Sequence, residues 1–361
     1  MKKKLALTLT LTVTTALLAG CSGGGNSADA RVVNVCGWGE NIEPELIDQF
    51  EEETGIKVNY QTAESNEAMY ALIKNGGANY DVIVPSDYMI SQMIEEDMLA
   101  ELNFDNIPNF SLVDDRFKNL SYDPENKYTV PYTWGTLGII YNSDVVKEDV
   151  TSWDIMFDPA YAGQTAMINN PRDALGIALM KLGYSINTTD ENEIREAYQL
   201  IADAKNNGVY QGFFMDEIYD KMEGGETSVC TYYAGDYLVM YENNPSLRWA
   251  VPENGSNWFV DAMCVLKDAE HKEEAEAWIN FITSTEASLA NMDFIWYATP
   301  NKEALEQYPA YYEEQNGEPL DPALYEVMAA PQEILDKCES YLGLPEETRT
   351  LYNDLWNELG I

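Results

Sequence analysis

The chain has 361 residues, a length that suits two domains better than one. Its 62 acidic and 21 basic side chains give a formal net charge of -41, which makes nucleic acids and anionic lipid surfaces poor partners. A mean hydropathy of -0.33 argues against a polytopic membrane protein, and a 45% share of hydrophobic residues is enough to build ordinary cores.

The N-terminal segment has the pattern of a lipoprotein signal. Three lysines precede an apolar stretch at residues 5–19, and Leu18-Ala19-Gly20-Cys21 matches a lipobox. The stretch is too short to span a bilayer, which favours a cleaved signal over the alternative of a soluble core helix. We expect residues 1–20 to be a signal peptide, Cys21 to be the lipidated first residue, and residues 21–30 to be a flexible tether of small residues.

Strands and helices alternate from residue 31 onwards. Pro44 suits the first turn of a helix, and Gly55 suits its end. We expect strands at 31–36, 57–60 and 81–84, and helices at 44–54, 66–74 and from about 87 to 97. This order predicts a parallel sheet with helices on both faces.

A second α/β series follows the segment PYTWG at 131–135, which is a compositional break. We expect strands at 136–142, 166–168, 228–233, 248–251 and 261–266. The expected helices are 172–182, 190–206, 216–223, 237–243 and 271–283.

Cysteine and histidine usage narrows the chemistry. Cys36, Cys230, Cys264 and Cys338 are widely spaced and fit no CxxC pattern; three of them lie in apolar runs, so we expect buried free thiols rather than disulfides. The only histidine, His271, excludes a metal site built on several histidines, and no GxxxxGK[ST] loop is present. We therefore expect no cofactor and no metal.

Six segments in order carry a resemblance to a known family. They are NVCGWGENIEPELIDQFEEETGIKVNY, ESNEAMY, YDVIVPSDY, KYTVPYTWGTLGIIYN, YYAGDY and NWFVDAM. Over residues 31–357 the chain resembles the spermidine/putrescine-binding lipoproteins of polyamine ABC transporters. The W-x-E, V-P-S-x-Y and V-D-A-M elements are the most specific, whereas FEEETGIKV occurs in many solute-binding proteins.

The resemblance implies an α/β fold of the two-lobed periplasmic-binding-protein type II class. Each lobe is expected to be a mostly parallel sheet flanked by helices, and hinge crossovers join the lobes. Lobe one is expected to comprise 31–134 and 261–300, and lobe two 135–260 and 301–361. In such folds ligands bind in the inter-lobe cleft, and the lobes close around them.

The same resemblance implies a monomeric, non-catalytic substrate-binding component of an ABC importer. It is expected to capture spermidine or putrescine and to deliver it to permease subunits driven by a cytoplasmic ATPase. Its expected place is the extracellular face of the membrane or the periplasm, with Cys21 as the lipid anchor.

Polyamines are methylene chains with ammonium groups at fixed spacing. Their recognition needs aromatic walls for stacking and cation–π contact, and carboxylates to pair the buried ammoniums. Such residues are expected at strand ends, where open α/β sheets bind ligands. The resemblance assigns ligand contact to Trp38, Glu40, Ser86, Tyr88, Asp173, Tyr233, Asp236, Phe259 and Asp261.

Five of these residues also have an ordinary structural interpretation. Trp38, between Gly37 and Gly39, either packs under a loop or faces the ligand. Glu40 suits a solvated helix N-terminus, Ser86 a helix N-cap and Asp173 an exposed first turn. Asp261 either binds a cation or forms a salt bridge between domains.

The sequence departs from the family pattern where ligand length is decided. The family usually has Trp at the position of Phe259, although Trp258 lies beside it. Other departures are Gly39 for a small hydroxyl residue, Asn170 for a carboxylate of some members, and Tyr341-Leu342 where spermidine-type members have Gln. Asp236 matches putrescine-type members, so the length of the polyamine stays open.

Three other functions are consistent with parts of the sequence. Tyr232-Tyr233 resembles the paired tyrosines of iron-binding relatives, and hard oxygen ligands suit ferric iron. A secreted lyase or hydrolase could use paired carboxylates. A sensor or adhesion lipoprotein could keep the binding fold without transport.

Overall fold

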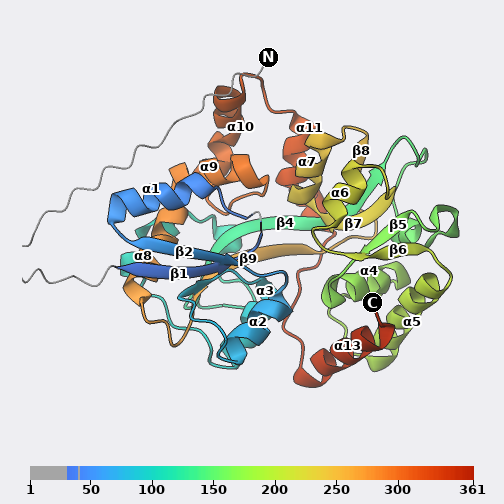
Figure 1. Cartoon of the computed structure of the whole chain (residues 1–361), viewed down its shortest axis with the longest axis horizontal. Helices are drawn as coiled ribbons and strands as arrows, with labels where there is room; N and C mark the ends of the chain where they lie inside the picture. The colour runs from blue at the N-terminus through green and yellow to red at the C-terminus, as the bar shows by residue number, and fades with distance from the viewer. Residues whose placement is uncertain (1–30, 40) are drawn as a thin grey trace, which may run out of the picture. The chain divides into compact units, whose positions relative to one another are not determined.

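The computed structural model describes residues 31–39 and 41–361 (Figure 1). The expected signal peptide, Cys21, the tether and Glu40 lie outside the described residues. Arg31–Ile361 forms one compact unit, so the expected lobe boundaries, 31–134 with 261–300 and 135–260 with 301–361, stay a prediction.

The strands carry the labels of Figure 1. They are β1 Val32–Gly37, β2 Lys57–Thr62, β3 Val82–Ile83, β4 Thr129–Asn142, β5 Thr165–Ile168, β6 Tyr210–Phe214, β7 Val229–Tyr233, β8 Leu247–Ala250 and β9 Trp258–Val265.

The α-helices are α1 Pro44–Thr54, α2 Asn66–Lys74, α3 Asp87–Glu95, α4 Pro171–Leu182, α5 Glu191–Asn206, α6 Ile218–Glu223, α7 Ala234–Asn243, α8 Lys272–Ile282, α9 Thr285–Ile295, α10 Lys302–Asn316, α11 Pro322–Met328, α12 Gln332–Leu335 and α13 Glu346–Leu359. Short 3-10 helices span Phe104–Asn106, Pro108–Leu112, Asp115–Phe117, Trp153–Phe157 and Pro159–Tyr161. None of these helices is long and apolar enough to cross a membrane, a statement that covers only the residues described.

The strands join in the order β2-β1-β3-β9-β4-β7-β5-β6, and β8 pairs with β4. The pairs β1–β2, β1–β3, β5–β6 and β5–β7 are parallel, as the alternation of strands and helices predicts. The long strands β4 and β9 pair antiparallel with each other and connect the two parallel parts (Figure 1).

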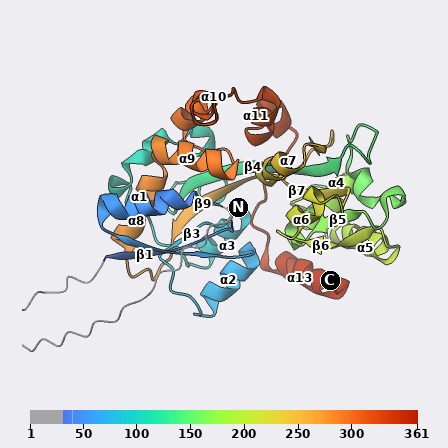
Figure 2. The same ribbon diagram turned by 45° about the horizontal axis from the view of Figure 1, so that its top comes forward.

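Alternating side chains of β1, β3 and β9 belong to two hydrophobic clusters. Val35, Val82 and Val265 pack with α1, α8 and α9 on one face. Cys36, Ile83 and Cys264 pack with α2 and α3 on the other face. The sheet is therefore covered by helices on both sides, which both views of the ribbon show (Figures 1 and 2).

A third cluster surrounds β4, β5 and β7. Leu137, Ile139, Ala166, Ile168 and Val229 are completely or almost completely buried in it. Helix α7 covers one side of these strands, and α5 with α13 lies on the other (Figures 1 and 2). This arrangement confirms the second α/β series.

Local signals fix several ends of elements as expected. Pro44 begins α1, and Gly55 ends it with φ of 69°, a conformation that favours glycine. Ser65 caps α2 by accepting a hydrogen bond from Ala68 N. The observed bounds of both helices equal the expected ones.

Three expectations need correction. The strand expected at 136–142 begins earlier, at Thr129, because the segment 131–135 also belongs to β4, where a register shift between Pro131 and Thr133 accommodates the proline. Strand β6 was not expected, although its aromatic run YQGFF follows a glycine turn at Gly208. Helix α7 also begins at Ala234, three residues earlier than expected.

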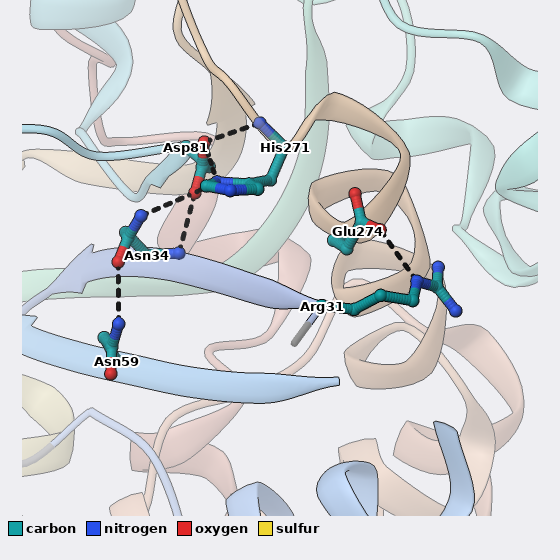
Figure 3. Close-up of polar contacts among 6 residues, drawn as sticks. All are labelled: Arg31, Asn34, Asn59, Asp81, His271 and Glu274. Carbon is teal, nitrogen blue, oxygen red and sulfur yellow. Dashed lines mark hydrogen bonds and ion pairs between the residues drawn. The ribbon is translucent and has the colours of Figure 1, made fainter. Parts of the chain in front are cut away.

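A buried carboxylate ties β1 to β3 and to the start of α8 (Figure 3). Asp81, which is 2% exposed, accepts hydrogen bonds from Asn34 N at 2.8 Å and Asn34 Nδ2 at 3.0 Å. It also accepts from His271 N at 3.0 Å, and His271 Nδ1 lies 3.1 Å from its Oδ2. Arg31, beside it, pairs with Glu274 of α8 at 2.8 Å.

The four cysteines after residue 30 are free, as expected. Cys36, Cys230 and Cys264 are buried, and Cys338 is partly buried. Burial raises the pKa of each of these thiols, which makes them poor nucleophiles.

Candidate ligand-binding site

A cavity of about 520 Å³ lies where several strands end. Trp38 follows β1, Ser86 follows β3, Asp173 lies beyond β5, and Tyr233 ends β7. The carboxyl ends of β1, β3, β5 and β7 therefore meet at one place, which is where α/β sheets bind ligands.

The cavity brings together eight of the nine expected contact residues, and the ninth, Glu40, is not described. The eight are Trp38, Ser86, Tyr88, Asp173, Tyr233, Asp236, Phe259 and Asp261.

Asp261 is buried, with 6% of its surface exposed. Its Oδ1 accepts from Ser86 Oγ at 2.7 Å, and its Oδ2 accepts from Trp38 Nε1 at 3.1 Å. Burial raises its pKa to about 7, and the two neutral donors only partly oppose that rise. None of the ion pairs among the described residues includes Asp261, so the salt-bridge interpretation is not supported.

Trp38 faces this carboxylate rather than packing under a loop. Neither of the flanking glycines has a positive φ. Instead, a Cβ on Gly37 would lie 2.1 Å from the hydroxyl oxygen of Tyr60, so Gly37 makes room for that ring. Gly39 is less restricted, with Asp216 Oδ2 at 3.4 Å from such a Cβ.

Ser86 occupies the N-cap position of α3 but makes no side-chain capping bond. Its hydroxyl donates to Asp261 instead, and Asn66 holds it in place. Asn66 Oδ1 accepts from Ser86 N at 3.0 Å, and Asn66 Nδ2 donates to Ser86 Oγ at 3.1 Å. The geometry therefore joins α2 and α3 to the carboxylate of β9.

Asp173 lies in the first turn of α4, but it is only 4% exposed rather than a surface acid. Tyr233 OH donates to its Oδ2 at 2.7 Å, and Tyr341 OH donates to its Oδ1 at 3.1 Å. Burial raises its pKa to about 6, despite both hydroxyls. The side chain of Asn170 caps the helix by accepting from Arg172 N and Asp173 N.

Asp236 lies in the first turn of α7 and accepts hydrogen bonds from the hydroxyls of Tyr219 and Tyr297. Burial raises its pKa to about 6. Like the other two acids, it is paired only with neutral donors. Each of these carboxylates therefore has capacity for a cationic partner.

Phe259 rather than Trp258 lines the cavity, because Phe259 lies two residues before Asp261 on the same face of β9. Its ring is edge-on to Tyr233, with centroids 5.3 Å apart, and 6.2 Å from the ring of Tyr297. Tyr88 and Tyr341 form a second edge-on pair at 5.9 Å. These rings give the cavity aromatic walls.

The charges of the cavity have one sign. Its described lining includes Glu64, Asp87, Asp173, Asp216, Asp220, Glu223, Asp236 and Asp261, and no lysine, arginine or histidine. Asp87 is 3% exposed, and its Oδ2 has no hydrogen-bond partner within residues 31–39 and 41–361. Burial, aided by the nearby Asp261 carboxylate, raises the pKa of Asp87 well above its ordinary range.

Comparisons with known proteins identify the family of the chain. Residues 45–315 match the family model described as bacterial extracellular solute-binding protein. The chain belongs to this family. It is 36% identical over 267 residues to the spermidine/putrescine-binding periplasmic protein of Escherichia coli K12, covering 73% of this chain and 76% of that protein.

Two further relatives extend the similarity. The putrescine-binding periplasmic protein SpuD of Pseudomonas aeruginosa is 29% identical, covering 99% of this chain and 97% of that one. The crystal structure of the spermidine/putrescine ABC transporter substrate-binding protein PotD from Streptococcus pneumoniae, in complex with calcium and HEPES, has a TM-score of 0.75 and 33% identity, covering 91% of this chain and 98% of that one. The periplasmic-binding-protein fold expected for this solute-binding protein is thus confirmed.

Several cavity residues of this solute-binding protein were not singled out from the sequence. Asp87, Asp216, Tyr219 and Tyr297 line the cavity, and Tyr232, considered only for iron, donates to Asp216 at 2.9 Å. Tyr219 and Tyr297 lie 17 and 61 residues from their partner Asp236. Only Asp87 had a local signal, since it lies between Ser86 and Tyr88.

Proposed function

We propose that the chain is a polyamine-binding protein that captures spermidine or putrescine in this cavity and delivers it to an ABC permease. One observation carries the proposal. Two buried carboxylates, Asp261 and Asp173, and the partly buried Asp236 face a cavity with aromatic walls, and their hydrogen-bond donors are all neutral. A ligand with several cationic groups would complete these contacts.

The energetics are sufficient for such a ligand. A charge-assisted hydrogen bond contributes about 1.5 to 3 kcal/mol net, and a cation–π contact about 0.5 to 2 kcal/mol. Two or three of each are compatible with micromolar binding, roughly -8 kcal/mol, after the costs of association. Asp261, Asp173 and Asp236 are the proposed partners of the ammonium groups, and the rings of Trp38 and Phe259 are proposed to stack on the methylenes.

The similarity to relatives named for spermidine and putrescine supports this ligand class. We further propose that Cys21 carries the lipid anchor, that the protein acts as a monomer outside the cell membrane, and that it has no catalytic activity. Its permease partner is proposed to be driven by a cytoplasmic ATPase, as in other ABC importers.

The rings of Tyr232 and Tyr233 lie side by side with centroids 5.1 Å apart, which keeps ferric iron as the alternative ligand. However, their hydroxyls donate to two different carboxylates, Asp216 and Asp173. The cavity also offers aromatic walls that a hydrated or chelated metal would not need. This geometry favours the polyamine.

Isothermal titration tests the proposal with residues 29–361, which contain the whole compact unit. The ligands are putrescine, cadaverine, spermidine and spermine, with ferric citrate and maltose as controls. Micromolar or tighter binding of a polyamine, lost in Asp261→Asn but kept in the exposed control Asp105→Asn, supports it. Absence of binding to every polyamine would contradict it, and binding of ferric citrate alone would establish the alternative.

A further inference from the structure

A second cavity of about 560 Å³ adjoins the first. It is lined by α2, α3, the start of α4 and α13, and the ring of Tyr88 lines both cavities. In contrast to the acidic first cavity, the second contains two arginines, Arg172 and Arg349. The charged lining is therefore acidic in the first cavity and includes arginines in the second, and the change occurs at the boundary between the two cavities.

Arg172 lies on this boundary, with 6% of its surface exposed. Its guanidinium lies 4.5 Å from the ring centroid of Tyr341, 5.3 Å from that of Tyr88 and 5.5 Å from that of Tyr352. Among the described residues its Nε has no hydrogen-bond partner, and its Nη2 reaches oxygens of Asn187 and Leu342 only at 3.4 Å. Aromatic faces are thus its principal surroundings.

A carboxylate completes these surroundings. Glu67 Oε1 accepts from Tyr88 OH at 2.9 Å, while its buried Oε2 has no hydrogen-bond partner in the described part of the chain. Burial raises the pKa of Glu67, and the positive charge of Arg172 acts in the opposite direction. Three aromatic rings and an incompletely bonded carboxylate therefore surround one cation, which is the chemistry that an ammonium group of a polyamine requires.

We propose that Arg172 occupies the position that a further ammonium of a longer polyamine would take, and that it thereby limits ligand length at the Asp173 end of the first cavity. This inference rests on the proposed function. Asp173 is the neighbour of Arg172 in the sequence, and Tyr341 lies between them in space, bonded to Asp173 and stacked on Arg172. A polyamine anchored at Asp173 would therefore meet the guanidinium if it extended further.

The limit has an electrostatic and a steric part. A guanidinium and an ammonium repel each other strongly in a buried site, because little water screens them. The rings of Tyr88 and Tyr341 are also held in place by the guanidinium between them and the second cavity. A neutral side chain at position 172 would leave the three ring faces and Glu67 available to the ligand.

The test compares spermidine with the tetraamine spermine by isothermal titration on residues 29–361. The unsubstituted protein is expected to bind spermine at least about tenfold more weakly than its best shorter polyamine. Arg172→Gln, which removes the charge and keeps a polar side chain, is expected to raise the spermine-to-spermidine affinity ratio about tenfold. Arg172→Lys retains a cation and is expected to retain the ratio.

Two controls separate the proposal from a general charge effect. Arg349→Gln makes the same change of charge in the second cavity, but Arg349 contacts Leu344 O and Glu95 rather than the three rings. The spermine-to-spermidine affinity ratio of Arg349→Gln is expected to stay within about twofold of that of the unsubstituted protein. Combining Arg172→Gln with Glu67→Gln is expected to remove the gain, because the two residues act on the same ammonium.

An affinity of the unsubstituted protein for spermine equal to that for its best shorter polyamine would overturn the proposal, and this result needs no variant to fold. An unchanged ratio in folded Arg172→Gln, or the same rise in Arg349→Gln, would also overturn it. Thermal unfolding of each variant establishes folding. If no polyamine binds the unsubstituted protein, the proposed function itself fails, and this inference fails with it.

Discussion

Asp261 and Asp81 are two buried aspartates: Asp261 lies on β9, and Asp81 lies directly before the neighbouring strand β3. They differ in their hydrogen bonding. Asp81 receives four contacts, from the main chain and side chains of Asn34 and His271 (Figure 3). Asp261 receives two, from the neutral groups of Trp38 and Ser86. It faces a cavity, and its pKa is raised to about 7.

The difference distinguishes a structural acid from a binding acid. Asp123 agrees with the first type, because its oxygens accept from Lys127 N, Tyr128 N, Thr129 N and Thr129 Oγ1. A carboxylate whose bonds are all made inside the protein has little to gain from a ligand. One that is buried and incompletely bonded gains most from a cation.

The largest expected effect concerns Asp261. Asp261→Asn removes the charge that the proposed ammonium would pair with, so the affinity for the polyamine is expected to fall at least about a hundredfold. The fold should be retained, because the amide keeps an acceptor for one of the two donors and removes a buried charge. Titration and thermal unfolding measure both quantities. Unchanged affinity would remove Asp261 from the binding acids.

The pH dependence of binding is expected to be nearly as large. The pKa values of Asp261, Asp173 and Asp236 are raised to about 7, 6 and 6, and a bound ammonium requires the ionised forms. Binding therefore needs proton loss below these values, and affinity falls as the pH falls. From pH 8 to pH 5, Asp261 alone predicts about a hundredfold loss.

The same shifts affect the ligand-free protein in the opposite sense. Because the folded pKa values lie above the ordinary value of 3.8, the folded state binds more protons than the unfolded state between that value and about pH 7. The contribution of these groups to stability is present at low pH and is lost as the pH rises. Titration of the polyamine from pH 5 to pH 8 measures the predicted loss of affinity, and a constant affinity over this range would contradict the predicted pH dependence of binding.

Asp81→Asn is expected to affect stability rather than binding. Its amide would place an N–H₂ group against donors of Asn34 or His271, so the free energy of unfolding should fall by about 1 to 3 kcal/mol. Denaturant unfolding measures this loss. The polyamine affinity should stay within about threefold of the original. Weakened binding in a stable Asp81→Asn protein would erase the distinction between the two aspartates.

The smallest effect is expected at the exposed ion pair beside Asp81. The side chain of Arg31 is 53% exposed, and that of its partner Glu274 is 16% exposed. Glu274→Ala should change the free energy of unfolding by less than about 1 kcal/mol, as is usual for surface pairs. If Glu274→Ala lowered the free energy of unfolding as much as Asp81→Asn, the exposed ion pair would be as important for stability as the buried contacts of Asp81.

Sequence alone predicts those parts of the molecule that depend on residues close together in the sequence. The ends of α1 and α2 follow from Pro44, Gly55 and Ser65. The full length of β4 does not, because Pro131 and Gly135 argue against a strand, and only the pairing with β9 accommodates them. Strand β6 is defined by β5, 45 residues before it, through the pair Thr165 and Tyr210.

The candidate site shows the same division. Asp81 in YDVIV and Asp261 in FVDAM look alike, since each is an acid in an apolar run. Only residues distant in the sequence decide that one is fully bonded and the other is not. The pairing of Asp236 with Tyr219 and Tyr297, and the position of Arg172 among three rings, likewise depend on tertiary packing.

The bond between Trp38 and Asp261 has an optical consequence. Trp134, Trp153 and Trp278 are almost completely buried, whereas Trp38 is partly exposed at the cavity. An ammonium that approaches the Asp261 oxygen bonded to this indole would change the electric field across the ring. The wavelength of the ring's fluorescence emission would change with it. Occupancy of the cavity should therefore be visible in the intrinsic fluorescence of the unlabelled protein.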